Sequence, residues 1–180
     1  MKATNYSHRL WIFAMSFIVS SFSPNPELEW NDRWDCQVYP PEHEVTQDPV
    51  TGAKVIFVTT DSSRDLNLYF DQNSWFFDLS MMVLYSNRTG RNELFGYLPE
   101  TGELVRLQRE DQHPAGMATV DYQSHDIYVV RNNVAYQWRV AIELSKDPKI
   151  RSKVKVRERK VVSAPEGTSF FQPLRLKQIK

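Results

Sequence analysis

Cysteine and glycine are scarce in this chain of 180 residues, which has one cysteine and six glycines. A single cysteine, Cys36, excludes a disulfide framework and a cysteine metal cluster. The low glycine content, with 41% hydrophobic and 24% charged residues, excludes a collagen-like or wholly disordered chain. Helical periodicity is also weak, and only the segment 141–146 favours a helical turn. The sequence is instead rich in aromatic residues, at 13%, which favours an all-β or mixed core.

The formal net charge is zero, but the charge is unevenly distributed. Residues 1–145 hold eleven Lys and Arg against nineteen Asp and Glu, whereas residues 146–180 hold eleven against three. This distribution is not typical of a uniformly basic nucleic-acid protein, so we expect no nucleic-acid partner.

The first residues have the pattern of a secretory signal. Lys2, His8 and Arg9 precede an uncharged, mostly apolar run at 10–19, and small residues and prolines follow it. A basic start, a short apolar region and a small-residue end predict a signal peptide over 1–23, and therefore export to the periplasm or the extracellular space. The run is too short to predict a stable membrane span. An N-terminal core helix is the alternative interpretation.

The rest of the chain divides into an extended leader at 24–50 and a β-rich region at 51–180. The leader is acidic, aromatic and interrupted by prolines, as is typical of a segment that lies across a domain. After it, regular turn signals separate short runs with partial alternation, which predict strands. The predicted strands are 54–59, 74–77, 82–86, 93–98, 104–107, 117–121, 127–131, 134–139 and 154–162.

A faint internal repeat indicates how these strands are organised. Phe77-Asp78 followed by Val83-Leu84-Tyr85 is similar to Val120-Asp121 followed by Ile127-Tyr128-Val129, at an offset of 43 to 44 residues. Four short strands within a period near 40–50 are typical of a β-propeller blade. An ordinary β-sandwich with similar hairpins fits the periodicity equally well.

Five motifs stand out in the β-rich region: DLNLYFDQNSW at 65–75, VLYSNRTG at 83–90, NELF at 92–95, ETGELVRL at 100–107 and VVRNNV at 129–134. These motifs resemble the first blades of the oligogalacturonate lyase family, which are TolB- and WD40-like propellers. The resemblance covers about 40–145. It departs from the family at the turn 78–80, which lacks the usual Asp-Gly, and at Gly96, where the family usually carries a polar residue.

The resemblance implies an all-β fold of propeller-like, four-stranded antiparallel blades. With blade-like repeats near 51–110 and 115–163, the chain is expected to form an incomplete propeller of about two to three blades, because closed propellers need about four to eight. The implied activity is β-elimination of short galacturonides in pectin degradation. The family's divalent metal, of the manganese type, would be held by residues outside this chain, so this chain alone is expected to be inactive. The alternative is a non-catalytic, TolB-like propeller that binds a protein or a glycan.

Site residues carried over from the family are few. Asn67, Tyr69 and Gln72 are expected on the strand nearest the propeller channel, where they would contact substrate, although Tyr69 also suits a core position. Arg88 suits a clamp on a uronate carboxylate, with a surface or turn-locking role as the favoured alternative. Catalytic residues are not identified, and no two of the four histidines have the spacing of metal ligands.

Two aspartates and one histidine are expected to have structural roles within turns. Asp78 and Asp121 occupy equivalent repeat positions and are expected to make hydrogen bonds within their turns. His125 suits a general base, but an exposed loop histidine is the favoured interpretation.

The basic segment 146–160 holds eight Lys and Arg against two Asp and Glu. Its alternation predicts a strand with one basic face. This face would attract a polyanion, either a pectate fragment or a nucleic acid. The resemblance implies an oligogalacturonide or another anionic glycan as the partner. The favoured alternative is an edge strand protected by its charge. Open sheet edges in an incomplete propeller would also permit self-association.

Overall fold

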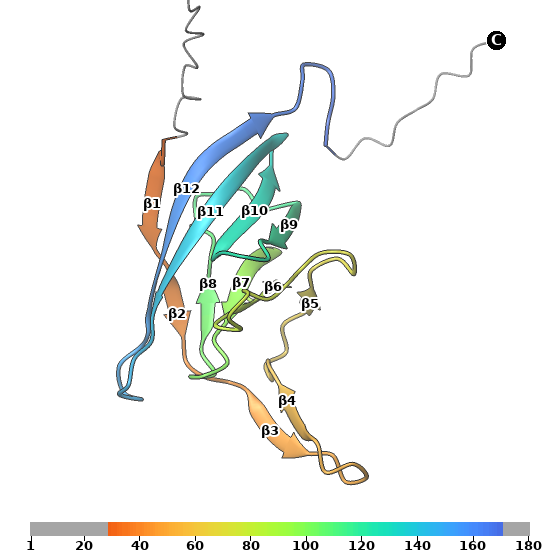
Figure 1. Ribbon diagram of the computed structural model, residues 1–180, viewed down its shortest axis with the longest axis vertical. Helices are drawn as coiled ribbons and strands as arrows, with labels where there is room; N and C mark the ends of the chain where they lie inside the picture. Colours follow the sequence, from red (N-terminus) through yellow and green to blue (C-terminus); the bar gives the residue numbers. More distant parts are fainter. Residues whose placement is uncertain (1–28, 171–180) are drawn as a thin grey trace, which may run out of the picture.

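A computed structural model describes residues 29–170 as an all-β fold without a helix (Figure 1). The predicted signal at 1–23 lies outside the described residues. Within 29–170 no helix has the length and apolarity that crossing a membrane requires. The strands are β1 (Asp32–Asp35), β2 (Gln37–Tyr39), β3 (Glu44–Gln47), β4 (Lys54–Phe57), β5 (Asp65–Asn67), β6 (Met82–Ser86), β7 (Glu93–Tyr97), β8 (Leu104–Arg106), β9 (Met117–Val120), β10 (Asp126–Arg131), β11 (Val134–Glu143) and β12 (Lys153–Ser163).

Two antiparallel sheets of five strands form the body of the molecule. Sheet A has the order β1-β12-β11-β10-β9, and sheet B has the order β2-β8-β7-β6-β5. In each sheet, four strands follow one another in the chain as an up-and-down meander, which is the arrangement of a propeller blade. The sheets do not close into a ring. The fold is therefore all-β and propeller-like, with two blades in place and open rather than closed.

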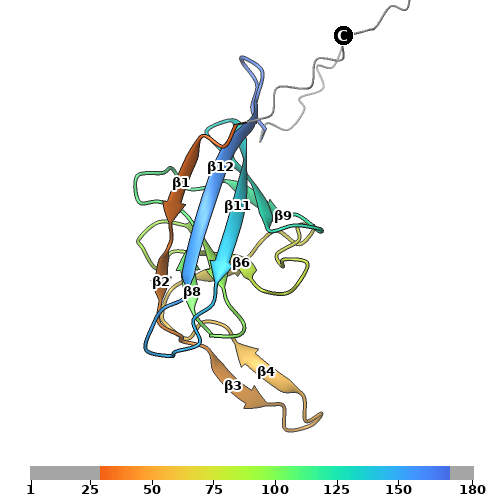
Figure 2. The same ribbon diagram turned by 60° about the vertical axis from the view of Figure 1, so that its left-hand side comes forward.

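The fifth strand of each sheet comes from one extended segment near the N-terminus. We call residues 32–39 the clasp: β1 pairs with β12 in sheet A, and after Cys36 the chain continues as β2, which pairs with β8 in sheet B. Figure 2 shows β1 and β2 in line along the outer strands of the two sheets. The clasp thus joins the outer edges of the two blades through backbone hydrogen bonds.

The main core lies between the two sheets. Val83, Leu94 and Val105 of sheet B and Val129 and Trp138 of sheet A belong to one buried cluster. The clasp adds Trp34, whose ring meets that of Trp138 edge to face at 5.6 Å and whose indole N–H donates to the Leu107 carbonyl at 2.9 Å. Because aromatic and β-branched side chains fill the space between the sheets, each sheet commits one face to the other.

The two sheets differ in what covers their second faces. Every residue of β7 is buried, because a smaller cluster around Phe95 and Tyr97 fills the far side of sheet B, where Tyr39 and Val58 pack against it. In β12 burial alternates from Lys153 to Glu158, so the far side of sheet A is open to solvent. A strand buried on both faces loses its alternation, whereas a half-exposed strand keeps it.

Three expectations about secondary structure and strand position are wrong. The segment 141–146 is not a helical turn, because β11 continues to Glu143 in register with β12. The segment 74–77 forms only an isolated bridge at Trp75, and the innermost strand of sheet B is β5. Finally, the basic strand β12 is not an edge strand, since β11 pairs with it on one side and β1 on the other.

Gly96 explains one departure from the family pattern. An added Cβ at this position would collide with the Sδ of Met81, which is fully buried. The strand therefore needs a glycine here for the methionine to pack against its backbone.

We expect Gly96→Ala to lower the free energy of unfolding by about 1–3 kcal/mol, as is typical of overpacking a close-packed core. Urea denaturation measures this change. The same substitution beside Met81→Ala should cost less than the two single changes added together, because the alanine methyl then enters vacated space. Additive costs would contradict the contact.

Candidate anion-binding face

The open side of sheet A gathers basic side chains from three strands. On β12, Lys155 and Arg157 are exposed, whereas Val154 and Val156 between them are buried in the core. The predicted basic face of this strand is thus present. Since directly opposed residues of an antiparallel pair lie on the same side of the sheet, the register identifies which neighbours share this face.

One row of opposed residues crosses four strands. Arg33 of β1 faces Arg157 of β12, Arg157 faces Arg139 of β11, and Arg139 faces Asp126 of β10. Neighbouring strands lie about 4.8 Å apart, so the three guanidinium groups start from backbones spaced by that distance. We call this row, with Trp30 beside it, the arginine face.

The charges along the arginine face are unequally compensated. Arg139 is neutralised by Asp126, which accepts hydrogen bonds from its Nε at 2.8 Å and from its Nη2 at 2.9 Å, and these bonds lower the pKa of Asp126 against the effect of burial. Lys155 lies 3.3 Å from a carboxylate oxygen of Asp35. By contrast, Arg33 and Arg157 have no ion pair with any residue in 29–170.

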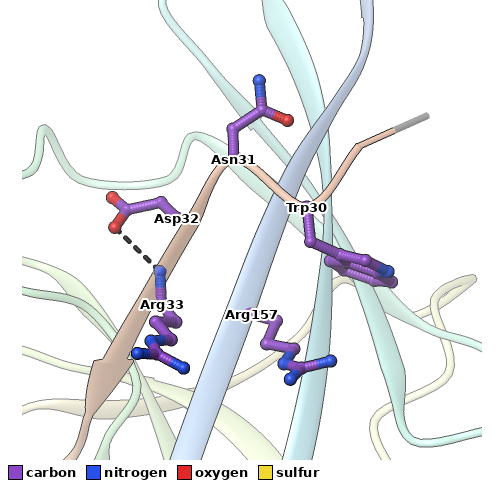
Figure 3. A pocket seen from close by; sticks show the side chains of 5 residues that line it. All are labelled: Trp30, Asn31, Asp32, Arg33 and Arg157. Atoms are coloured by element: carbon purple, nitrogen blue, oxygen red, sulfur yellow. Dashed lines mark hydrogen bonds between the residues drawn. The ribbon is translucent and has the colours of Figure 1, made fainter.

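Trp30 supplies an aromatic surface next to these arginines. Its ring lies 4.9 Å from the guanidinium carbons of both Arg139 and Arg159. Figure 3 shows the side chains of Trp30, Arg33 and Arg157 around a hollow of about 420 Å³, which Asn31 and Asp32 also line. A second hollow of about 470 Å³ adjoins it along β1 and β12 and shares Arg33 and Arg157. The face can therefore offer two unpaired guanidinium groups and a flat ring to one ligand.

The family-derived site residues lie elsewhere, at the opposite edge of sheet B. Asn67 ends β5, and Tyr69 and Gln72 belong to the turn that follows this strand. The Tyr69 backbone N–H donates to Oε1 of Gln72 at 3.2 Å, and the Tyr69 ring is 64% exposed, so Tyr69 is not a core residue. Their contact with a substrate stays a prediction.

Arg88 lies among carboxylates of its own chain. Its Nη2 donates to Glu42 at 2.9 Å and to Asp65 at 3.2 Å, and its Nη1 lies 3.8 Å from Asp61. The guanidinium also donates through Nε to Ser86 at 3.0 Å, and its side chain is only 7% exposed. These contacts fasten the turn after β6 to the segment 42–65.

In the described part of the chain, the carboxylates of Glu42, Asp61 and Asp65 are close enough to resemble a set of metal ligands. Their candidate ligand atoms all lie within 4.8 Å of one another. They do not fit a divalent cation, because the Arg88 guanidinium already occupies the space between them and supplies the positive charge. We therefore assign the group to fold stability and derive no metal chemistry from it.

The turn residues behave largely as expected. Asp78 accepts the backbone N–H of Ser80, and Asp121 accepts the hydroxyl of Ser124, so both make the local hydrogen bonds predicted for them. His125 is half-buried rather than exposed: its ring stacks on Phe76 at 4.8 Å, and its Nε2 lies 2.9 Å from Asp78. This contact joins a turn of sheet A to a turn of sheet B.

Sequence reasoning missed Trp30 and Arg33 as site residues. Both belong to the leader, where four residues of strand between prolines give no usable alternation. The only signal was the aromatic and charged composition of 27–50. Their partners on β11 and β12 lie more than 100 positions away, so only strand pairing brings them together.

The fold and the face define a class: a propeller-like pair of antiparallel blades with an exposed basic surface. No family model matches the chain, and no curated protein matches it. Among solved structures, an oligogalacturonate lyase from Vibrio parahaemolyticus is 17% identical, with a TM-score of 0.48. An oligogalacturonate lyase in complex with manganese is 16% identical, with a TM-score of 0.49.

Both likenesses are partial and concern the fold alone. Each alignment covers 57% of this chain and 27% of the solved chain, so little more than half of this chain matches about a quarter of either structure.

The contact between His125 and Asp78, which joins a turn of sheet A to a turn of sheet B, predicts that the stability of the fold depends on pH. Burial opposes ionisation of Asp78, but hydrogen bonds from Ser80 and His125 outweigh it and lower its pKa from 3.8 to about 2. A carboxylate with a lowered pKa stabilises the fold above its ordinary pKa, and this contribution is lost as the pH falls through the folded-state pKa. Melting temperatures of the chain and of Asp78→Asn should therefore differ above pH 4 and converge towards pH 2. A difference that stayed constant down to pH 2 would contradict this role.

Proposed function

We propose that this chain is a non-catalytic binding module for an acidic glycan of the oligogalacturonide class, and that the ligand binds at the arginine face. The observation that carries the proposal is the pair Arg33 and Arg157, which are directly opposed on one side of sheet A and have no carboxylate partner within 29–170. Two uncompensated guanidinium groups favour an anion, and each suits a carboxylate in fork-to-fork geometry.

The surroundings of the pair support a carbohydrate rather than an isolated ion. Trp30 adds a rigid ring with a large apolar area at low cost in conformational entropy, which suits a flat apolar surface such as that of a sugar ring. Arg33 and Arg157 lie on neighbouring strands about 4.8 Å apart, so the pair suits a ligand that carries carboxylates on successive units. The excess of basic residues after position 145 would accelerate the encounter with any polyanion.

Calorimetric titration of the chain with a trigalacturonide tests the proposal. Arg33→Ala and Arg157→Ala should each weaken binding by about tenfold, which corresponds to the loss of one charge-assisted hydrogen bond. Lys160→Ala is the matched control. It removes the same charge from β12, but its partner is Tyr136, whose ring packs against the core side, so binding should not change.

A second titration identifies the chemistry that is recognised. The methyl ester of the same trigalacturonide has no carboxylates and should bind far more weakly. Equal binding of ester and acid, or equal losses in all three variants, would refute the proposal. Stronger binding of a single-stranded oligonucleotide than of the acidic glycan would replace it with nucleic-acid recognition.

A lyase is the second candidate function, and the motifs at 65–75, 83–90 and 100–107 favour it. In this case the chain would contribute blades to β-elimination of oligogalacturonides, with most catalytic groups supplied from outside 1–180. When this chain alone is incubated with an oligogalacturonide and manganese, we expect no increase in the ultraviolet absorbance of the unsaturated product. Turnover that a chelator abolishes would establish the lyase function instead.

Location and assembly complete the proposal. A ligand from the plant cell wall is consistent with export through the segment 1–23. Self-association would proceed through β5 and β9, the strands at the inner ends of the two sheets.

A further inference from the structure

The strand β1 is a terminal strand of sheet A and has a strand neighbour, β12, on one side only. Four residues of β1 pair with β12, and the backbone N–H groups of Asn31 and Cys36 extend this ladder by bonds of 2.9 Å and 2.8 Å to β12 carbonyls. Trp34 also packs on Trp138 of β11 in sheet A. Towards sheet B, the Trp34 indole N–H donates to the Leu107 carbonyl, and Asp32 pairs with Arg109. A short outer strand of this kind is drawn from the part of a fold that opens most easily.

One like-charge pair in the β1–β12 ladder has no compensating partner and opposes the attachment. Arg33 and Arg157 face each other, and the Cβ atoms of directly opposed residues in antiparallel strands lie about 4.5–5.5 Å apart. Like charges at this separation destabilise strand pairing. The next pair on the same face, Asp35 with Lys155, is attractive and lies on the same two strands. The ladder also opposes Asp32 to Glu158, but each of these carboxylates has its own arginine partner, Arg109 for Asp32 and Arg131 for Glu158. The uncompensated repulsion in the β1–β12 ladder is therefore at the arginine pair.

We infer that an anion bound between Arg33 and Arg157 fastens β1 to sheet A, so that ligand binding and docking of the clasp are coupled. The inference rests on the proposed function for its ligand. The two guanidinium groups belong to one site only while β1 is paired with β12. An anion that bridges them therefore binds the docked form more tightly than the open form and shifts the equilibrium towards docking.

Coupling of this kind is reciprocal. Whatever holds β1 in place raises the affinity for the anion by the same factor as the anion favours docking. The arginine pair then weakens the attachment of β1 to β12 when no ligand is bound and strengthens it when an anion is bound. Removal of one arginine should accordingly stabilise the attachment of β1, which is the opposite of the effect expected for a residue that merely supports the fold.

Hydrogen exchange of the full chain, followed by mass spectrometry on the peptide that contains β1, tests the inference. Inorganic sulfate is the probe, compared with chloride at equal ionic strength. Sulfate should slow exchange of β1 several-fold. Without sulfate, Arg157→Gln should slow exchange of β1 by about two- to fivefold, since removing a like-charge pair restores up to about 1 kcal/mol, and sulfate should then have no further effect.

Lys160→Gln is the control for general charge effects. It also removes a positive charge from β12, but on the other side of the strand, so exchange of β1 should still respond to sulfate. Faster exchange in Arg157→Gln than in the unaltered chain would overturn the inference, and so would equal protection by sulfate in both. A response to sulfate that Lys160→Gln also abolishes would show general screening and would overturn it as well.

The same experiment with trigalacturonide separates this inference from the proposed function. Protection of β1 by sulfate but no binding of the glycan would refute the glycan as ligand and leave the coupling intact. Binding of the glycan that depends on Arg33 but leaves β1 exchange unchanged would refute the coupling alone.

Discussion

Face-to-face packing of the two sheets around Trp138 is the constraint on which the other features depend. Successive side chains of a strand point to opposite sides, so a strand that buries Val154 and Val156 must expose Lys153 and Lys155. The arginine face is therefore the necessary reverse of the core rather than a separate element. Among the described residues sheet B has no comparable face, because the cluster around Phe95 and Tyr97, with Val58 packed against it, fills its second side.

The clasp converts two blades into one unit. A single extended segment pairs with the outer strand of both sheets, and the indole of Trp34 enters the core between them. Closed propellers avoid free edges by completing a ring. Here a fifth strand covers the outer strand of each blade, so the strands at the ends of the two sheets are β1 and β9 in sheet A and β2 and β5 in sheet B.

The buried carboxylates show how charge is accommodated near the core. Glu93 is fully buried, yet two hydrogen bonds from Arg106, at 2.8 Å and 3.1 Å, lower its pKa against the effect of burial. Arg88 is enclosed by carboxylates in the same manner. Most arginines of the two sheets are thus committed to internal partners, and this commitment distinguishes Arg33 and Arg157 from the rest.

By itself the sequence determined the all-β class, most strands after position 80 and the basic face of β12, because all of these follow from alternation within short segments. It did not determine the role of the leader, since pairing between residues more than 100 positions apart has no signature in local periodicity. Tertiary structure alone made β12 an interior strand and placed Arg33 opposite Arg157. It also gave Arg88 carboxylate partners, because only folding brings 42 and 61–65 to the turn after β6.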